Sequence, residues 1–391
     1  MRFFLYGYYG QGNVGDDLLL RSCVLGIRSL CPDARFVVRA GRVATGLDPF
    51  TVPFEVSEVD EVLADQTRSR LSRLVSALAA YRNHLRNCDW LVFGGGTLFH
   101  ERPSPMPLVL LLMLCLMARA MGVRIAALGV GIAELKSRRA LAALKGIVAL
   151  SEVFAVRDEA ALEQCHRAGA FGPVLTSDLA FTLASACVSG DVKRIAAAGP
   201  TIGISVYPPA IEEGEAAYDL RSALQEVVLR LQRSGYAVRL LAFHHASDGG
   251  VGDDEAVLAR LVEDIPVTPR PPVVSVTLAR DTSLLASSFD GIDLICGMRF
   301  HGHVLAAIYG IPFVGIAADN KINAICRLFD MPILPIDRLT ADKVVAAIAA
   351  TLSRKPDRGL VDRAVAQAHQ NFSLFADALA QRRHPAKTSR P

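Results

Sequence analysis

The sequence lacks several features that mark common protein classes. Its net charge is only +3, from 42 basic and 39 acidic residues, which is too slight to indicate a nucleic-acid-binding surface. Its eight cysteines form no C-x-x-C pair, so we expect buried thiols in a reducing compartment. The first residues contain no long apolar stretch followed by a small-residue cleavage site. The sequence therefore predicts no signal peptide and a cytoplasmic protein.

Long hydrophobic runs are also missing. The longest run, 107–118, is closed by Arg119, whereas a membrane-spanning helix needs about twenty apolar residues. We predict a buried helix here. A peripheral membrane contact through the same run, at the inner face of the membrane, is the open alternative.

The chain does contain a clear alternation of short β-branched runs with segments of helical period, which is typical of repeated βα units and parallel sheets. With 51% apolar and 21% charged residues, it has a globular composition. We predict an α/β fold of two Rossmann-like domains facing a cleft, with mostly parallel sheets. The predicted strands are 2–6, 34–40, 90–93, 124–128, 153–156 and 174–176 in the first half, and 201–206, 237–243, 273–276, 294–296, 312–316 and 333–335 in the second.

A small, polar segment at 185–200, closed by a proline, separates the two sets of strands and predicts the domain junction. We assign residues 1–190 to an N-terminal, acceptor-side domain and 198–345 to a C-terminal, donor-side domain. Residues 346–391 are expected to form an amphipathic helix that packs back across the body, followed by a basic tail.

Polar and glycine-rich clusters follow nearly every predicted strand. Ligands bind outside the carboxyl ends of the strands in doubly wound sheets, so we expect both rows of clusters to line one cleft. The clusters are 10–16, 94–97, 129–131, 157–158, 177–178, 244–245, 297–303 and 319–321.

The first cluster, GYYGQGNVGDD, contains the G-x-G-x-x-G spacing of a dinucleotide loop. Asp16 and Asp17 open the following helix, where they stabilise the helix dipole but repel a pyrophosphate. In a dinucleotide-binding fold an acidic residue at the end of the next strand binds the ribose. Here the end of that strand carries Arg39 and Arg42, and no acidic residue is present there. We therefore disfavour a dinucleotide and expect Asp16 to meet sugar hydroxyls.

FGGGT provides Gly95 and Gly96, which are free to adopt positive φ and to bring backbone amides close to a ligand before a segment that becomes helical. The alternative is a tight turn needed only for packing.

GMRFHGH places Arg299 and His301 at a strand-to-helix boundary, where positive groups oppose the helix dipole. This pattern favours a functional role for both, whereas His303 is expected to orient or pack.

Two further cations follow strands. Arg157 suits a carboxylate or phosphate, with a surface ion pair to Asp158 as the alternative. Lys321 in ADNK suits a phosphate or is merely solvated. His244 begins a pair of histidines near several aspartates, but their spacing matches no defined metal site, and we predict no metal.

Five arginines lie on a helix-like insert before Trp90, where they form a solvated face or a surface for an acidic acceptor. They are Arg68, Arg70, Arg73, Arg82 and Arg86.

The ordered set of motifs resembles the polysaccharide pyruvyl transferases, over about residues 2–328. The motifs are GYYGQGNVGDD, FGGGT, FAVRD, SDLAF, LAFHH, GMRFHGHVLAAIYGIPFVGI and ADNK. The resemblance implies two Rossmann-like domains of GT-B shape and transfer of pyruvate from phosphoenolpyruvate to a sugar as a ketal. It places active-site or donor-binding roles on Asp16, Arg157, Arg299, His301 and Lys321. This sequence departs from the family pattern in three places. Phe300 stands where leucine is commoner, and Ala242 stands where a proline is usual. The three residues before Lys321 are ADN, where the family usually has YDP.

From the resemblance we expect His301 to act as general acid, because an imidazole titrates near neutral pH. Asp16 is expected to orient the acceptor or accept its proton. Arg157, Arg299 and Lys321 are expected to hold the donor, with Asn13, Gly95, Gly96 and His244 as further substrate-binding residues.

The expected partners are phosphoenolpyruvate, as co-substrate, and a lipid-linked, nucleotide-linked or polymeric sugar. No cofactor or nucleic acid is expected, and the sequence does not indicate the oligomeric state. A GT-B glycosyltransferase that uses a nucleotide sugar and a noncatalytic carbohydrate-binding protein are the rival interpretations; a dehydrogenase is a more distant one.

Overall fold

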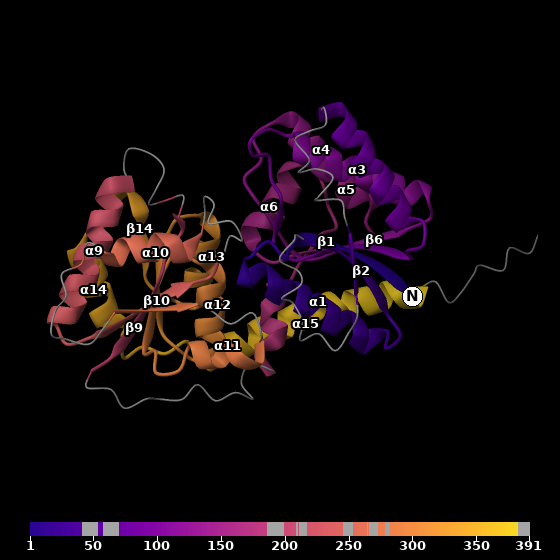
Figure 1. Cartoon of the computed structure of the whole chain (residues 1–391). Helices are drawn as coiled ribbons and strands as arrows, with labels where there is room; N and C mark the ends of the chain where they lie inside the picture. Colours follow the sequence, from indigo (N-terminus) through magenta and orange to yellow (C-terminus); the bar gives the residue numbers. More distant parts are fainter. Residues whose placement is uncertain are drawn as a thin grey trace, which may run out of the picture.

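The fold is given by a computed structural model, shown in Figure 1. The structure describes residues 1–40, 54–57, 70–185, 199–208, 210, 217–244, 253–263, 265, 273–277 and 282–381. The chain forms two separate sheets whose strand pairs are all parallel.

The first sheet has the order β3-β2-β1-β4-β6-β7-β8, with β5 paired to β6. All six predicted strands of the first half are confirmed, and two short strands, β3 and β5, were not predicted. β5 is missed because its three residues directly follow the glycines of FGGGT. The strands are β1 (Arg2–Tyr9), β2 (Arg35–Ala40), β3 (Phe54–Ser57), β4 (Trp90–Gly94), β5 (Thr97–Phe99), β6 (Arg124–Ile132), β7 (Val153–Val156) and β8 (Val174–Leu175).

The second sheet has the order β11-β10-β9-β12-β13-β14, and its six strands confirm the prediction for the second half. In both sheets the chain winds outward from its first strand and then reverses, which creates a switch point between β1 and β4 and another between β9 and β12. The strands are β9 (Thr201–Ser205), β10 (Ala237–Ala242), β11 (Val273–Thr277), β12 (Leu294–Gly297), β13 (Phe313–Ala317) and β14 (Ile333–Pro335).

Helices cover both faces of each sheet (Figure 1). On the first sheet, one face carries α3 (Arg70–Leu85), α4 (Met106–Ala120), α5 (Arg138–Leu150) and α6 (Glu159–Arg167). The other carries α1 (Val14–Leu30), the 3-10 helix η2 (Leu179–Leu183) and α15 (Arg358–Gln381). The second sheet packs α9 (Ala217–Arg233), α10 (Asp254–Glu263) and α14 (Ala341–Thr351) on its outer face. Its inner face packs α11 (Thr282–Ser288), α12 (Phe300–Tyr309) and α13 (Asn320–Leu328), and the short η3 (Ile336–Arg338) follows β14.

One hydrophobic core runs through both domains. It joins the α1 and α15 side of the first sheet to the α12 and α13 side of the second. Phe181 of η2 contacts Phe329, just after α13, with ring centroids 6.1 Å apart. The two carboxyl edges are therefore held together by buried apolar contacts as well as by polar ones.

Helix α15, which lies within the range 346–391 in which an amphipathic helix is expected, packs back onto the first domain. It contacts η2, α1, β6 and β7, and Phe375 packs edge-on against Trp90 with centroids 4.7 Å apart. Near its end the carbonyl of Ala378 accepts a bond from Arg124. The expected boundary at 345/346 is too early, because it cuts through α14, which packs on α9 and β13 of the second domain. The expected junction at 185–200 falls largely outside the described residues.

The long apolar run forms α4, whose inner residues are buried. In the part of the chain that the structure describes, no helix combines the length and the apolar composition needed to cross a membrane. Most of the described cysteines are buried, as predicted, and burial raises the pKa of Cys23 to about 12. Cys187 lies outside the described residues.

We predict that Phe375→Ala destabilises the protein by about 3–5 kcal/mol, as is typical when a buried aromatic is truncated. Phe375 is fully buried between Trp90 and Phe3. Urea unfolding followed by tryptophan fluorescence is the measurement, since the one tryptophan of the chain is the contact partner. The exposed Gln370→Ala on the same helix is the control; an equal stability for both variants would contradict a packing role for α15.

Candidate active site

A cavity of about 210 Å³ lies between the carboxyl edges of the two sheets. Seven of the nine predicted site residues line it: Asn13, Asp16, Gly96, Arg157, Arg299, His301 and Lys321. They come from the β1–α1, β4–β5 and β7–α6 connections of the first domain, the β12–α12 connection of the second, and the first turns of α1, α12 and α13. The structure thus brings together residues far apart in the sequence.

The GNVGDD motif forms the start of α1. Asn13 is the N-cap and accepts a hydrogen bond from the Gly15 amide at 3.0 Å, and Asp17 accepts one from the Gly10 amide at 2.8 Å. A Cβ on Gly15 would overlap the imidazole of His301. Glycine is needed here because the second domain places a ring directly against the first turn of this helix.

His301 lies in the first turn of α12 with a side chain that is 12% exposed. Its Nε2 is buried and has no hydrogen-bond partner among the described residues. The nearest carboxylate oxygen, Oδ1 of Asp178, is 3.7 Å away, which is longer than a hydrogen bond. Catalytic hydrogen bonds are often long before the ligand binds.

Arg157 follows β7, as predicted, and its side chain is 4% exposed. Its guanidinium donates to Asp158 at 3.2 Å, to Asp178 at 3.2 Å and to Thr97 at 2.9 Å, and it stacks on the ring of Phe300 at 4.7 Å. A guanidinium carries five N–H groups. Arg157 uses three of these groups in hydrogen bonds to described residues, so two N–H groups can bind a ligand.

Arg299 is the N-cap residue of α12 and is held by the second domain. Its guanidinium pairs with Asp254, which is fully buried, and donates to the carbonyl of Val206 at 3.0 Å. It also lies 5.3 Å from the ring centre of Tyr207. His303 is buried below it and contacts the Arg299 carbonyl through Nδ1 at 2.9 Å, which confirms the expected packing role.

Lys321 is the most exposed of the three cavity cations. Its Nζ lies 3.0 Å from Oδ2 of Asp319, and both side chains are more than a third exposed. Asp319 is also the N-cap of α13 and accepts from the Lys321 amide at 3.1 Å. The aspartate of ADNK therefore positions the lysine at the rim of the cavity.

Gly95 and Gly96 both adopt positive φ, +75° and +76°, as predicted. The expected helix does not follow them, because β5 intervenes before α4 begins at Met106. The Gly95 amide donates to the Leu128 carbonyl at 2.9 Å, so it is used inside the sheet. Of the two glycines, Gly96 lines the cavity, and the assignment of Gly95 to substrate binding stays a prediction.

His244 does not line the cavity either. Its Nε2 lies 3.1 Å from the Gln11 carbonyl, and its backbone forms an isolated β-bridge with Asn13. It therefore contributes to the contact between the domains. No group of three His, Cys, Asp or Glu residues in the described part of the chain is placed to hold a metal ion. Asp254, one of the nearby aspartates, binds Arg299 instead.

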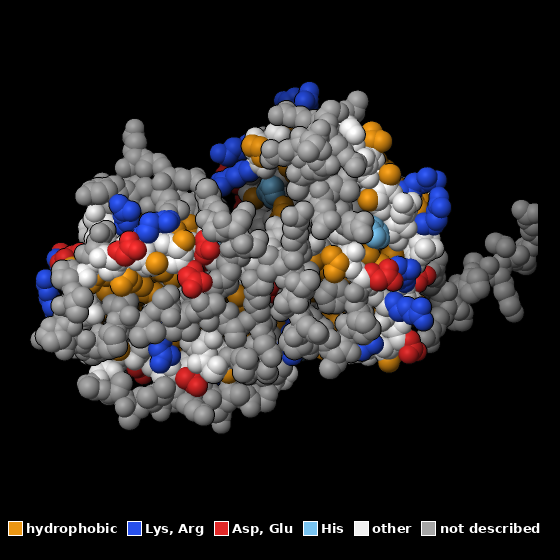
Figure 2. Space-filling view, viewed as in Figure 1, with side chains coloured by type: hydrophobic (Ala, Val, Ile, Leu, Met, Phe, Trp, Pro, Cys, Tyr) orange, Lys and Arg blue, Asp and Glu red, His pale blue; other side chains and the backbone are white. Residues whose placement is uncertain are grey.

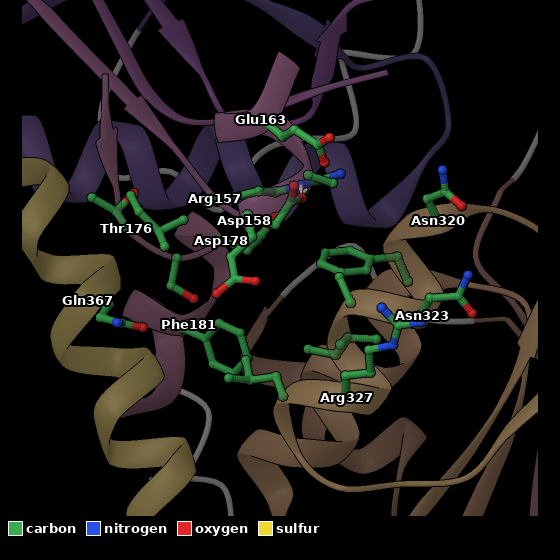
Figure 3. Close-up of a pocket in the computed structure, with 18 residues that line it drawn as sticks. Arg157, Asp158, Glu163, Thr176, Asp178, Phe181, Asn320, Asn323, Arg327 and Gln367 are labelled. Atoms are coloured by element: carbon green, nitrogen blue, oxygen red, sulfur yellow. Dashed lines mark hydrogen bonds and ion pairs between the residues drawn. The ribbon is translucent and has the colours of Figure 1, made fainter. Parts of the chain in front are cut away.

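A second, larger cavity of about 600 Å³ adjoins the first, and Arg157 and Phe300 line both. Figure 3 shows its walls: Asp178, Thr176 and Glu163 from the first domain, Asn320, Asn323 and Arg327 on α13, and Gln367 on α15. Its polar lining is mostly carboxylate and amide, with Phe181 adding an aromatic face.

Two carboxyl groups of the site have shifted pKa values of opposite direction. Burial raises the pKa of Asp16, and the nearby charges of His301, Lys321 and Arg157 only partly offset it. Burial would also raise the pKa of Asp178, but the neighbouring imidazole of His301, together with the charge of Arg157, lowers it overall. Asp16 is thus the more basic of the two carboxylates.

Asp178 belongs to the predicted cluster 177–178, in the motif SDLAF, but the sequence predicts no role for it in the site. Its position directly after β8, on an edge that already carries Arg157, was the available signal. Tyr207 and Thr97 also line the cavity. Tyr207 was missed because VYPP, after β9, has neither the charge nor the glycines used to find the other clusters.

Comparison with solved structures shows the GT-B fold. UDP-GlcNAc 2-epimerase from Neisseria meningitidis matches with a TM-score of 0.63 and 8% identity over 97% of this chain and 100% of that one. HepE from Anabaena, in complex with UDP-glucose, matches with a TM-score of 0.54 and 14% identity over 98% of this chain and 99% of that one. At these identities the likeness is one of fold.

A comparison with curated proteins found no matching sequence. The model of one family, described as polysaccharide pyruvyl transferase, matches residues 13–320. This span covers most of the chain and includes every residue of the smaller cavity except Tyr8 and Lys321. The chain therefore belongs to the polysaccharide pyruvyl transferase family.

Proposed function

We propose that the protein transfers the pyruvyl group of phosphoenolpyruvate to two hydroxyls of a sugar, forming a cyclic ketal and releasing phosphate. Membership of the family supports pyruvylation of a polysaccharide or its precursor in general terms. One observation carries the finer proposal: a single small cavity contains an imidazole, a carboxylate of raised pKa and three cationic side chains.

The smaller cavity suits the donor. At about 210 Å³ it is below the range of roughly 300–1,000 Å³ that is typical of sites for larger ligands. A three-carbon acid phosphate is small enough for it, whereas a nucleotide sugar is not. The free N–H groups of Arg157 and Arg299, with the ammonium of Lys321, are suited to a carboxylate and a phosphate.

The proposed reaction begins when one sugar hydroxyl adds to the central carbon of phosphoenolpyruvate. Its proton passes to the carboxylate of Asp16, while the imidazolium of His301 protonates the terminal methylene and makes it a methyl group. The C–O bond to phosphate then breaks, the electron pair leaves on inorganic phosphate, and the phosphate takes the proton from Asp16, which is again a carboxylate. The second hydroxyl closes the ketal and gives its proton to the now neutral imidazole. One donor and one diol thus yield one ketal and one phosphate.

The larger cavity suits the acceptor. Carboxylate and amide groups exchange hydrogen bonds with hydroxyls, and these are the groups that line it. Arg157 and Phe300 form a wall common to both cavities. A sugar in the larger cavity would therefore meet the donor beside this wall, next to Asp178 and His301.

A GT-B glycosyltransferase is the rival function, because structural neighbours include a protein solved with UDP-glucose. The direct test incubates the protein with phosphoenolpyruvate and a panel of nucleotide-linked and lipid-linked sugars. Release of phosphate together with a mass gain matching a ketal is the expected result. Transfer of a sugar from its nucleotide without phosphoenolpyruvate would reject the proposal.

We predict that His301→Ala lowers kcat by about 10²–10⁴-fold, the usual contribution of a general acid or base. Donor binding, measured by calorimetry, is expected to stay close to that of the natural protein because the cations remain. Asp178→Asn should reduce kcat less, since it removes the charge that faces the ring and that pairs with Arg157 but leaves the imidazole in place. If His301→Ala keeps full turnover, His301 is not the general acid.

We predict that Lys321→Met raises the KM for phosphoenolpyruvate by about 10- to 100-fold, because a hydrogen bond to a charged group contributes about 1.5–3 kcal/mol. The side chain is partly exposed, so the fold should tolerate the change. Lys355→Met, at an exposed lysine after α14, is the matched control. If both variants keep the natural KM, Lys321 does not contact the donor.

We predict that kcat/KM rises with pH through a midpoint above the ordinary carboxyl value of 3.8, since burial raises the pKa of Asp16 and the base must be ionised. Asp16→Asn should lose this pH dependence of kcat/KM and most of the turnover.

A carboxyl group whose pKa is raised in the folded state favours folding while it is protonated, and this contribution is lost as pH rises through the raised pKa. Thermal unfolding at pH 7 should therefore show Asp16→Asn to be at least as stable as the natural protein; a clear loss of stability would contradict the raised pKa.

A further inference from the structure

Three neighbouring helices of the first domain carry only positive charge. Helices α3, α4 and α5 have 16, 15 and 13 residues and contain no aspartate or glutamate. They contain seven basic residues: Arg70, Arg73, Arg82, Arg119, Arg138, Arg139 and Lys145. Residues 70–150 as a whole carry eleven basic and three acidic residues, in a chain whose total is +3. The near-neutral total therefore hides a strongly basic region.

The same layer exposes apolar side chains. Met106 (56% exposed), Met113 (42%) and Leu116 (51%) lie on the outer side of α4, and Val75 (58%) lies on the adjacent α3. The spacing of the α4 residues keeps them on one face, opposite the buried Leu108, Leu111, Leu114, Cys115 and Ala118. Four of the ten exposed large hydrophobic side chains in the described part of the chain lie on these two helices.

Exposed basic residues surround this apolar face. Arg102 precedes α4, Arg119 is in its last turn, Arg82 and Arg86 are at the end of α3, and Arg138 and Arg139 open α5. Figure 2 shows basic side chains at the upper and right-hand edges of the first domain, with hydrophobic side chains beside them. Of these six arginines, Arg119 has a carboxylate partner, Glu152, at 3.3 Å.

We propose that the outer surface of α3, α4 and α5 is a docking site for an anionic lipid bilayer. The exposed face of α4 enters the interfacial region, and the surrounding arginines bind the acidic headgroups. Apolar burial and attraction to anionic lipids act together in such surfaces. Nucleic acid fits less well, because stacking aromatics accompany basic residues in single-strand-binding sites and the exposed face of α4 carries none.

The position of this surface relates it to the cleft. Helices in parallel βαβ units begin near the carboxyl ends of the strands, so the start of α4 and the start of α5 lie toward the edge of the sheet that carries the cavity. A protein docked in this way would work on an acceptor held at the membrane. This last consequence rests on the proposed function, whereas the docking itself does not.

The test measures co-sedimentation of the full-length protein with large unilamellar vesicles. We expect binding to vesicles of phosphatidylcholine with 30% phosphatidylglycerol, at least about tenfold stronger than to phosphatidylcholine alone and weakened by salt. Met113→Ser/Leu116→Ser should reduce the partition coefficient by about 100-fold, at roughly tenfold for each large apolar side chain. Arg138→Glu/Arg139→Glu should reduce it by at least about 20-fold, at about fivefold for each charge removed.

Two variants elsewhere on the surface are matched controls. Phe171→Ser removes an apolar side chain that is 81% exposed, and Arg338→Glu reverses a basic side chain that is 79% exposed; both should bind vesicles like the natural protein. Thermal unfolding checks that all variants are folded.

The proposal is overturned if the natural protein does not sediment with anionic vesicles, or if the α4 variant binds them unchanged. It is also overturned if sedimentation velocity shows that the α4 variant converts a dimer into a monomer, because the face would then bind a second copy. Pyruvyl transfer to a water-soluble sugar is measured without vesicles. If the natural protein shows no such transfer, the result counts against the proposed function and not against membrane docking.

Discussion

The imidazole of His301 lies directly against the backbone of Gly15, at the point where the first helix of one domain meets the second domain. The way in which residues of the two domains face each other in the site depends on this contact. It requires a residue without a side chain at position 15, and it places Asp16, the next residue, beside the ring. It also requires that the two sheets keep a fixed relation, since a shift of a few ångströms would separate the imidazole from both Asp16 and Asp178.

The fixed relation comes from the buried core that both domains share and from α15. This helix begins beside α12, where Arg358 donates to the Ile308 carbonyl at 3.4 Å, and ends below the first sheet. Asn371, buried near its middle, bonds Thr176 at 3.1 Å and the Ser177 carbonyl at 3.3 Å. Those two residues directly precede Asp178, so the helix that joins the domains also supports the carboxylate that faces His301.

Much of this could be predicted from the sequence because parallel βα units repeat one pattern. Buried strands read as apolar runs, and ligand residues follow them at one edge, so Arg157, Arg299 and Lys321 could be placed near each other. The ion pairs between these cations and their carboxylate partners could not be predicted in the same way. The sequence indicated that Arg157 and Arg299 were unusual but not that Asp178 and Asp254 hold them, because these contacts span 21 and 45 residues. Gly95 shows the same limit: its positive φ could be predicted, whereas the hydrogen bond from its amide to the Leu128 carbonyl depends on the neighbouring strand.

The carboxylates around the cations have a consequence for the chemistry. Asp158, Asp178, Asp254 and Asp319 each contact one of the three cations, so an anionic donor would be held by oriented N–H groups more than by an excess of positive charge. Such preorganised donors need no rearrangement when charge moves onto a leaving phosphate. A like charge nearby raises the pKa of a carboxyl group, and burial has already raised that of Asp16. If phosphoenolpyruvate binds in this cavity, its charges therefore make Asp16 a stronger base, and donor binding itself prepares the site to take a proton from the acceptor.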